Sequence, residues 1–317
     1  MKILVTGGNG YVGRTLTRLL YDDHDVCVVD NLRFGAVRFS PDELERFELQ
    51  EIDVRDEDAL SGCIGTFGPD VVVHLAAIHY IPECEAEPAL TVSTNVTGTV
   101  NVLTATPKGA RVVFASSGAV YAPDEAPHRE DTSALGPADV YGWTKLQGEE
   151  WVAHFAADRG LAGVVVRLFN AVGPGETNPH LFPEVVAQLK AGRRTLELGN
   201  LTPRRDYIHV ADIADGLAAC CLGGHVEEGT VTTVNLGTSR HHSVEEVLDE
   251  VRRASGIDFL VERDPKRLRP VDRPVLAADI DRIRDQFGWT PSRTVEQAVA
   301  ELWDDPDVRD ELVDRYR

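Results

Sequence analysis

The sequence has few cysteines, and none of them lies in a metal-binding or disulfide-rich pattern. The five, Cys27, Cys63, Cys84, Cys220 and Cys221, are odd in number and show no CxxC spacing. This pattern argues against a disulfide scaffold and a zinc site, and we expect no metal site of any kind. Free cysteines are typical of a reducing compartment, so we expect the protein in the cytoplasm.

Long hydrophobic runs and positive charge are also scarce. No apolar run approaches the roughly 18 residues of a membrane span, and the opening MKILVTGG reaches glycine too early for a signal peptide, so we expect neither. Lys and Arg number 32 against 52 Asp and Glu, a formal net charge of −20. That charge repels phosphate backbones and anionic lipid surfaces, so we expect no nucleic acid and no membrane as partner. A local basic pocket could still hold an anionic ligand.

What the chain does have is an alternation of short apolar runs with longer amphipathic segments. The runs predict strands at 2–6, 25–29, 47–52, 71–75, 111–116 and 163–168. Between them, helices are expected at 10–20, 56–65, 88–105 and 140–159. Such alternation predicts an α/β fold with a doubly wound parallel sheet of the Rossmann type.

After residue 168 prolines and glycines become frequent, and helices are expected at 181–191, 210–222, 243–254 and 294–303. A chain of 317 residues is long enough for two domains. We therefore divide it into 1–168, a dinucleotide-binding Rossmann domain, and 169–317, a smaller C-terminal α/β lobe that binds the substrate. Segments around 206–237 are expected to return to the first domain.

A glycine-rich turn follows the first predicted strand. Gly8, Gly10 and Gly13 satisfy GxGxxG, and Gly7 with the last two satisfies GxxGxxG. Glycine permits a tight turn and close backbone approach, so that the next helix points its N-terminus at a pyrophosphate. Asp30 ends the second predicted strand, where a carboxylate accepts hydrogen bonds from the adenosine ribose and favours NAD over NADP. The pattern therefore predicts an NAD site.

Tyr141 and Lys145 lie four residues apart in the long helix predicted at 140–159, so both project from one face. A tyrosine acts as a base near neutral pH only if its pKa falls by about three units, and an ammonium nearby together with a positive nicotinamide could supply that field. Spacing alone favours a partly buried tyrosine beside a solvated lysine over a catalytic pair.

Two serines, Ser116 and Ser117, stand at the carboxyl end of a predicted strand, where parallel sheets bind ligands. For Ser117 we predict a hydrogen bond to a substrate hydroxyl or to the tyrosine. Ser116 fits either a site residue or a hydroxyl that caps backbone at the strand end.

Together these motifs resemble the extended short-chain dehydrogenase/reductase family, and within it the nucleotide-sugar epimerases and dehydratases of the UDP-glucose 4-epimerase type. The resemblance extends over nearly the whole chain. The matching segments are 6–13, 30–32, 53–54, 75–77, 95, 116–117, 141–145, 167–170, 173–175 and 205–210.

The resemblance implies roles for individual residues. Tyr141 is similar to the family's general base, Lys145 to the residue that lowers its pKa and holds the nicotinamide ribose, and Ser117 to the hydroxyl partner of the sugar. NAD is expected at Gly7, Gly10, Tyr11, Val12, Gly13, Asp30, Asn31, Asp53, Val54, Leu75, Ala76, Ala77, Asn95, Ser116, Tyr141 and Lys145. The nucleotide sugar is expected at His79, Ser117, Tyr141, Asn170, His180, Leu181, Arg205 and Arg269, with Leu276 beside the sugar ring.

The residues after Ser117 separate the reactions of the family. Dehydratases carry Asp-Glu there and UDP-glucuronate decarboxylases carry Glu, whereas this chain has Gly118 and Ala119, which cannot move protons. The resemblance then implies 4-epimerisation. Tyr141 takes the 4-hydroxyl proton as the C4 hydride passes to NAD, the 4-keto sugar rotates, and the hydride returns internally to the opposite face. UDP-glucose and UDP-galactose are the leading substrate pair, and a homodimer through a helix bundle that includes 140–159 is implied.

Alternatives stay open. UDP-glucuronate or a UDP-N-acetylhexosamine could be the epimerised sugar, and His79 and His180 in the pocket would favour a polar or anionic one. An NAD(P)H-dependent nucleotide-sugar 4-ketoreductase would use the same motifs, and a dinucleotide-sensing regulatory protein is the alternative that is not an enzyme. Arg204, Arg267 and Arg273 fit phosphate ligands and solvated surface charges equally well.

Overall fold

Seven parallel strands form the central sheet. The computed structural model describes residues 1–33, 35–176, 178–267, 273–306, 308 and 310–317. The strands are β1 (Lys2–Thr6), β2 (Asp25–Asp30), β3 (Glu48–Glu51), β4 (Val71–His74), β5 (Arg111–Ser117), β6 (Ala162–Leu168) and β11 (Val231–Leu236). Their order is β11-β6-β5-β4-β1-β2-β3, and every neighbouring pair is parallel. The order reverses between β1 and β4, which confirms the predicted doubly wound Rossmann sheet and places a ligand-binding crevice at this switch point.

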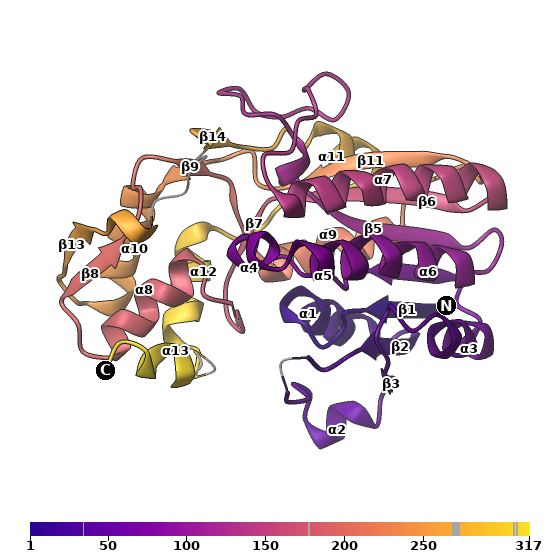
Figure 1. Cartoon of the computed structure of the whole chain (residues 1–317), viewed down its shortest axis with the longest axis horizontal. Coiled ribbons are helices and arrows are strands. Elements are labelled where there is room, and N and C mark those ends of the chain that lie inside the picture. Colours follow the sequence, from indigo (N-terminus) through magenta and orange to yellow (C-terminus); the bar gives the residue numbers. More distant parts are fainter. Residues whose placement is uncertain (34, 177, 268–272, 307, 309) are drawn as a thin grey trace.

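Helices cover both faces of the sheet (Figure 1). The helices of this part of the molecule are α1 (Tyr11–Leu20), α2 (Pro41–Leu44), α3 (Glu57–Phe67), α4 (Ile81–Ala86), α5 (Pro88–Val92), α6 (Gly98–Ala105), α7 (Val140–Arg159), α9 (Val210–Leu222) and α11 (Asp281–Phe287). The short α2 lies away from the sheet, beyond β3 (Figure 1). α1 packs on α9 on one face, while α3, α6 and α7 follow one another on the other. The helix predicted at 88–105 is interrupted by a π-helical turn, Ser93–Thr97, which separates α5 from α6.

The C-terminal lobe lies beside the carboxyl edge of the sheet, at the left of Figure 1. Its helices are α8 (Leu181–Lys190), α10 (Val244–Ser255), α12 (Val295–Asp304) and α13 (Asp310–Asp314). Its short strands pair as β7 (Asn170–Val172) with β10 (Tyr207–His209), β8 (Thr195–Leu198) with β13 (Leu260–Arg263), and β9 (Arg204–Arg205) with β12 (His242–Ser243) and β14 (Val275–Leu276). Buried apolar side chains such as Val185, Leu196, Val247 and Leu302 give the lobe a core of its own.

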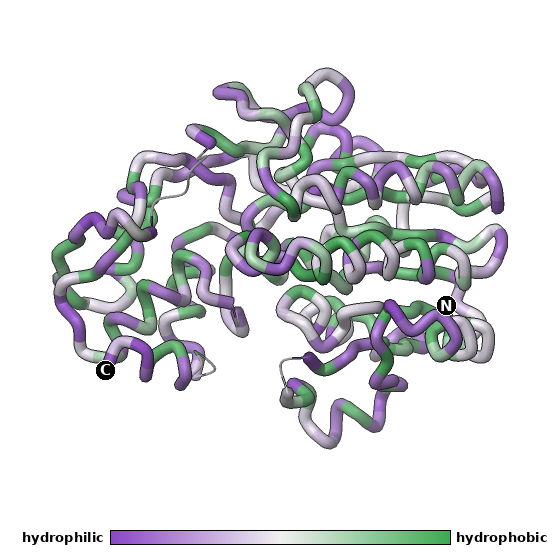
Figure 2. Tube along the Cα trace, viewed as in Figure 1, coloured by the Kyte–Doolittle hydropathy of each residue, from purple (hydrophilic) through white to green (hydrophobic). Residues whose placement is uncertain are grey.

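Several segments of the second half pack with the central sheet. β11 extends the sheet beyond β6, and Ile213 and Leu217 of α9 share a core with the first strands. Ile283 and Phe287 of α11 belong to the same core. Figure 2 shows the hydrophobic residues concentrated on the strands and on the helix faces that cover them. Across the described residues, no helix combines the length and the apolar character that crossing a membrane requires.

Candidate active site

The glycine turn between β1 and α1 leaves no room for side chains. Gly7 has a φ of 70°, and a Cβ on it would lie 2.7 Å from the backbone nitrogen of Ala76. A Cβ on Gly13 would clash with the carbonyl oxygen of Gly7. Backbone packed this closely brings the N-terminus of α1, with Tyr11 and Val12 in its first turn, to the switch point of the sheet. Such a cradle fits a dinucleotide pyrophosphate.

Asp30 lies at the end of β2, beside this turn. Its carboxylate accepts hydrogen bonds from the backbone N–H groups of Asn9, at 3.0 Å, and Leu32, at 2.9 Å. Burial raises the pKa of Asp30, while these two hydrogen bonds oppose the increase. The carboxylate is therefore fixed next to the cradle, which is the position expected for a ribose ligand.

The candidate adenine residues lie next along this edge. Asn31 donates to Asp53 at 3.0 Å, and Arg55 contacts both carboxylate oxygens of Asp53 at 2.9 and 2.7 Å. The Arg55 guanidinium, with Asn31, holds the pKa of Asp53 well below its usual range. Val54 is buried against Gly98 of α6. These contacts form one rigid corner beyond β2.

Two candidate cofactor residues use their polar groups within the protein. Asn95, in the π-helical turn, bonds the backbone N–H and C=O of Ile78 at 2.8 and 2.9 Å and the Thr144 hydroxyl at 3.0 Å. Ser116 bonds the buried Glu149 at 2.5 Å. Asn95 thus links the segment after β4, which carries the half-buried Leu75, Ala76 and Ala77, to α7.

Tyr141, Lys145 and Ser117 come together where β5 meets α7. Asp139 caps α7 by accepting the Gly142 N–H at 2.7 Å, which places Tyr141 in the first turn of the helix. Lys145 is buried one turn later, and its ammonium donates to the Ala115 carbonyl at 2.8 Å and lies 5.8 Å from the centre of the Tyr141 ring. The side chain of Ser117, at the end of β5, lies beside that of Tyr141 and interacts with it. The arrangement can move a proton between a bound hydroxyl and the phenol oxygen.

The electrostatics of this pair differ from the sequence-based expectation. Burial raises the pKa of Tyr141, and the hydrogen bond from Ser117 offsets part of that increase. Burial also lowers the pKa of Lys145 to about 8, because a desolvated ammonium is costly. A phenolate near neutral pH therefore requires more positive charge than Lys145 supplies alone.

The pKa of Lys145 predicts a pH limit on activity. Its ammonium is present below about pH 8 and is lost as the pH rises through that value. We expect kcat/KM to fall roughly tenfold per pH unit above this point, because the charge that favours the Tyr141 phenolate disappears. A pH profile of kcat/KM measures this. In Lys145→Arg, whose guanidinium stays charged, the activity should be low but free of this alkaline limb.

The turn after Ser117 is closed by an arginine that the sequence left ambiguous. Arg273 is buried, and its guanidinium donates to the carbonyl oxygens of Gly118 and Ala119 at 3.2 and 2.8 Å. Its own carbonyl accepts a hydrogen bond from Arg205 at 2.8 Å. Arg273 is therefore neither a solvated charge nor free to bind a phosphate. It connects the turn after Ser117 with Arg205.

Arg204 and Arg267 are also held by protein groups. Arg204 bonds His241 and Glu246, while Arg267 bonds Glu184 and the Tyr316 hydroxyl. Each guanidinium links two segments of the lobe, so neither arginine is a purely solvated surface charge.

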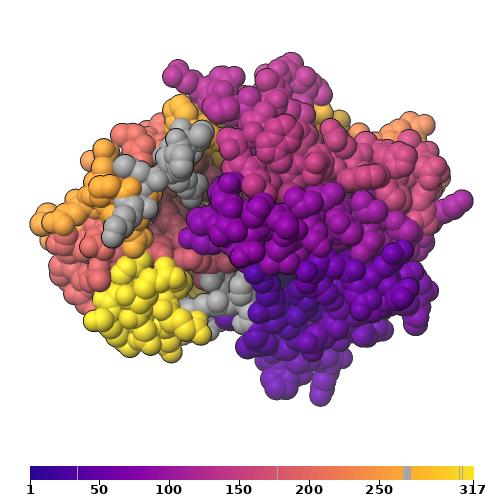
Figure 3. Space-filling model, viewed as in Figure 1, coloured from indigo at the N-terminus to yellow at the C-terminus, as the bar shows by residue number. Residues whose placement is uncertain are grey.

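Several candidate nucleotide-sugar residues lie in the lobe. Asn170 opens β7, and its side-chain oxygen is buried without a hydrogen-bond partner among the described residues. Arg205 lies on β9, and His180 is the N-cap of α8, immediately before Leu181. Arg269 lies outside the described residues. Figure 3 shows the surface hollowed between this lobe and the first hundred residues.

His79 links the segment after β4 to the lobe. Its Nε2 lies 3.1 Å from Nδ2 of Asn178, and its ring lies 5.7 Å from that of His180. The ring of Tyr80 is 5.8 Å from His180 as well. On the other side, Leu276 and Phe169 pack against Gly118, where an added Cβ would lie 3.3 to 3.4 Å from them.

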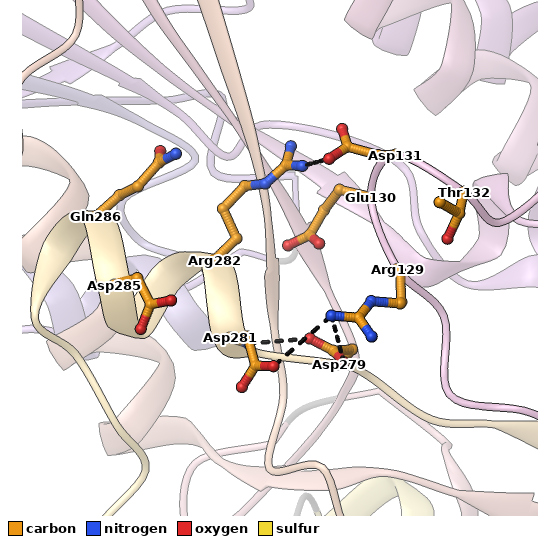
Figure 4. A pocket seen from close by; sticks show the side chains of 9 residues that line it. All are labelled: Arg129, Glu130, Asp131, Thr132, Asp279, Asp281, Arg282, Asp285 and Gln286. Atoms are coloured by element: carbon orange, nitrogen blue, oxygen red, sulfur yellow. Dashed lines mark hydrogen bonds and ion pairs between the residues drawn. The ribbon is translucent and has the colours of Figure 1, made fainter.

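A separate pocket of about 680 Å³ lies between α11 and the segment 129–132 (Figure 4). Its charged side chains pair with one another, Arg129 with Asp279 and Asp281, and Arg282 with Asp131. The carboxylates that line it outnumber the guanidinium groups, so it is poorly suited to a diphosphate. Among the described residues, no group of three or more His, Cys, Asp or Glu side chains is placed to hold a metal ion.

Sequence reasoning missed two residues that shape the site, Glu149 and Glu176, and it left the role of a third, Arg273, open. Arg273 and Glu149 act through contacts distant in the sequence, and neither belongs to a local motif. Glu176 lies four residues before His180, a spacing that brings the two side chains together here even though α8 begins only after His180.

A doubly wound sheet with a glycine cradle, an acidic residue after β2 and a Ser–Tyr–Lys cluster defines an NAD-dependent enzyme of the short-chain dehydrogenase/reductase class. Residues 3–237 match the NAD dependent epimerase/dehydratase family, and the chain belongs to that family. It is 33% identical to UDP-glucose 4-epimerase of Streptomyces lividans over 96% of this chain and 95% of that protein.

Solved structures agree with this assignment. The UDP-glucose 4-epimerase of Brucella ovis in complex with NAD superimposes with a TM-score of 0.84 at 28% identity, over 96% of this chain and 97% of that one. MoeE5 in complex with UDP-glucuronic acid and NAD gives a TM-score of 0.82 at 26% identity, over 96% and 98%. The predicted family, fold and use of NAD are confirmed; the protein is an enzyme of the nucleotide-sugar 4-epimerase family.

Proposed function

We propose that the enzyme interconverts the C4 epimers of a UDP-sugar, with UDP-glucose and UDP-galactose as the leading pair. The observation that carries this proposal is the Ser117–Tyr141 pair beside a turn, Gly118 and Ala119, that has no proton-transferring side chain. A dehydration or decarboxylation would need a further acid or base at this turn. Epimerisation removes and returns one hydrogen at C4, and Tyr141 alone can carry the hydroxyl proton that is lost and regained with it.

When bound, NAD accepts the C4 hydrogen with its electrons and gives it back to the other face of the sugar. The residues of the chain transfer the proton and orient the substrate. Tyr141, as the phenolate, takes the 4-hydroxyl proton onto its oxygen and later returns it, and Ser117 orients that hydroxyl. Lys145, fixed by the Ala115 carbonyl, favours the phenolate while it carries its charge.

We assign the cofactor to the cradle of Gly7, Gly10 and Gly13, with Tyr11 and Val12 in the first turn of α1. Asp30 and Asn31 are assigned to the adenosine ribose, Asp53 and Val54 to the adenine, and the strand end at Leu75, Ala76 and Ala77 to the path of the cofactor. Asn95 and Ser116 act in this assignment by bracing α7, because their polar groups bond Ile78, Thr144 and Glu149.

The nucleotide diphosphate is assigned to the lobe. Asn170 offers an unpartnered buried oxygen, Arg205 a guanidinium, and the N-terminus of α8 at His180 and Leu181 a positive dipole end. Gly118 packs closely against Phe169 and Leu276, so a larger residue at this position would displace these two side chains, which are assigned to the surroundings of the sugar ring.

UDP-glucuronate is the second candidate. The likeness to MoeE5, solved with UDP-glucuronic acid, favours an anionic sugar, and the neighbouring rings of His79 and His180 offer nitrogen atoms that can hydrogen-bond a carboxylate.

Proton NMR in D2O tests the reaction and names the sugar. The purified enzyme is given UDP-glucose, UDP-N-acetylglucosamine or UDP-glucuronate in separate tubes, with no added cofactor. We expect a new anomeric signal from the C4 epimer in one tube, without deuterium in the ring. Deuterium at C5 or loss of the carboxylate would contradict the epimerase, and no change in any tube would favour a ketoreductase.

We also propose a homodimer that pairs through α7 of each copy. Trp143 and Trp151 of this helix are 55% and 38% exposed, which is unusual for so large an apolar side chain. Trp143→Glu is expected to shift the protein from dimer to monomer in sedimentation velocity. Leu260→Glu, at a site 70% exposed on β13, is the matched control and should stay dimeric. A monomeric unaltered protein would refute the proposal.

A further inference from the structure

The segment between β7 and α8 carries a buried carboxylate that the assignments above leave unused. Glu176 is 3% exposed, and its Oε1 lies 2.5 Å from Nδ1 of His180. Its second oxygen, Oε2, is buried and has no hydrogen-bond partner among the residues the structure describes. A buried carboxylate held mainly by one imidazole is costly unless that imidazole compensates it.

The segment itself is tied to the cofactor helix. Tyr11 donates to the Gly173 carbonyl at 3.0 Å and Arg14 to the Gly175 carbonyl at 2.9 Å. These two anchors on α1 fix the backbone just before Glu176. The fold therefore fixes the position of the Glu176 carboxylate, and the carboxylate fixes the orientation of the His180 ring.

The contact determines the chemistry of the His180 ring. A carboxylate accepts hydrogen bonds, so Nδ1 of His180 must carry a proton toward Glu176. Nε2 is then the nitrogen left to meet a ligand, and the His180 side chain remains 37% exposed, at the N-terminus of α8 and beside His79 and Tyr80. In the imidazolium form of the ring, Nε2 also carries a proton and donates hydrogen bonds.

We propose that Glu176 is a positioning residue for substrate binding: it orients His180 so that Nε2–H donates to a phosphate oxygen of the bound nucleotide sugar. The inference rests on the proposed function, since it needs a diphosphate at the N-terminus of α8. Glu176 itself does not touch the ligand; its effect passes through His180. Such a contact, present before and after the sugar reacts, contributes to binding rather than to the rate of the chemical step.

The test is a double-mutant cycle read by calorimetric binding of UDP and by steady-state kinetics. Glu176→Gln is expected to weaken UDP binding about tenfold and to raise KM similarly, because a charge-assisted contact becomes a neutral one. The kcat should change less than twofold. His180→Phe keeps a ring against His79 and Tyr80 but removes both nitrogens, so it should weaken UDP binding at least as much.

The decisive comparison is Glu176→Gln in the His180→Phe background, where it should change UDP binding less than twofold. A merely structural role would weaken binding by the same factor in both backgrounds and would overturn the proposal, as would unchanged UDP binding in Glu176→Gln alone. Glu262→Gln, an exposed charge on β13, is the control and should bind UDP like the unaltered enzyme.

Two further outcomes can be told apart from a failure of this inference alone. If Glu176→Gln unfolds, Glu176→Asp replaces it in the same cycle, because its carboxylate is one methylene shorter and cannot reach Nδ1; the expected factors are the same. If the unaltered enzyme does not bind UDP, the proposed substrate class and this inference fail together. Binding by the unaltered enzyme with no effect of Glu176→Gln overturns this inference alone.

Discussion

Replacing Tyr141 with phenylalanine is expected to lower kcat by about a thousandfold while NAD stays bound. The variant loses only the phenol hydroxyl, which is the group that Ser117 bonds and that would take the substrate proton. The ring remains, so its packing and its position 5.8 Å from the Lys145 ammonium are retained. Epimerisation followed by NMR measures kcat, and the absorbance of nicotinamide released on denaturation measures bound NAD.

Tyr21→Phe is the matched control for this substitution. Tyr21 stacks on Phe47 at 5.9 Å, at the far end of α1 from the glycine turn, so its hydroxyl has no part in the proposed chemistry. It should keep kcat within a factor of two. More than a tenth of the normal kcat in Tyr141→Phe would show that another group moves the proton.

The parts of this molecule that could be predicted from sequence are those that depend on local patterns. The glycine turn, the strands before and after it, and the long helix with Tyr141 and Lys145 four residues apart all follow from spacing within a few residues. The boundaries of α7 and α9 were predicted correctly, and in α7 they coincide with the N-cap Asp139 and with Gly160 at the C-terminal end. β11 was missed, because its sequence VTTVNL has neither a continuous apolar run nor a strict alternation of apolar and polar residues.

The features that could not be predicted depend on pairs of residues that folding brings together. Arg273 reaches the carbonyl of Gly118 across 155 positions in the sequence. The π-helical turn that aims Asn95 at Ile78 interrupts a segment whose apolar pattern is that of one continuous helix. In the same way, the charge on Lys145 was expected to dominate Tyr141, but burial of both groups works against it, and burial is a property of the fold.

A further tertiary contact of this kind is the buried ion pair between Arg167 and Glu149. Arg167, on β6, contacts both carboxylate oxygens of Glu149 at 2.9 and 2.7 Å, and both side chains are about 90% buried or more. Ser116 adds a third hydrogen bond to the same carboxylate. Glu149 lies one turn after Lys145 on α7, so this network fixes the helix that carries the proposed base against β5 and β6. The guanidinium also packs over the Tyr121 ring at 4.7 Å.

Arg167→Met is therefore expected to lower the free energy of unfolding by about 3–5 kcal/mol, because Glu149 is left buried without its cation. Urea unfolding measures this, and kcat should fall along with stability because α7 loses its anchor. The double variant Arg167→Met with Glu149→Leu removes the stranded charge, so it should recover most of the lost stability. If the single variant proved no less stable than the double variant, the pair would not be the anchor of α7, and the geometry of Tyr141 would have to depend on the Lys145 contact with Ala115 and the Asp139 cap instead.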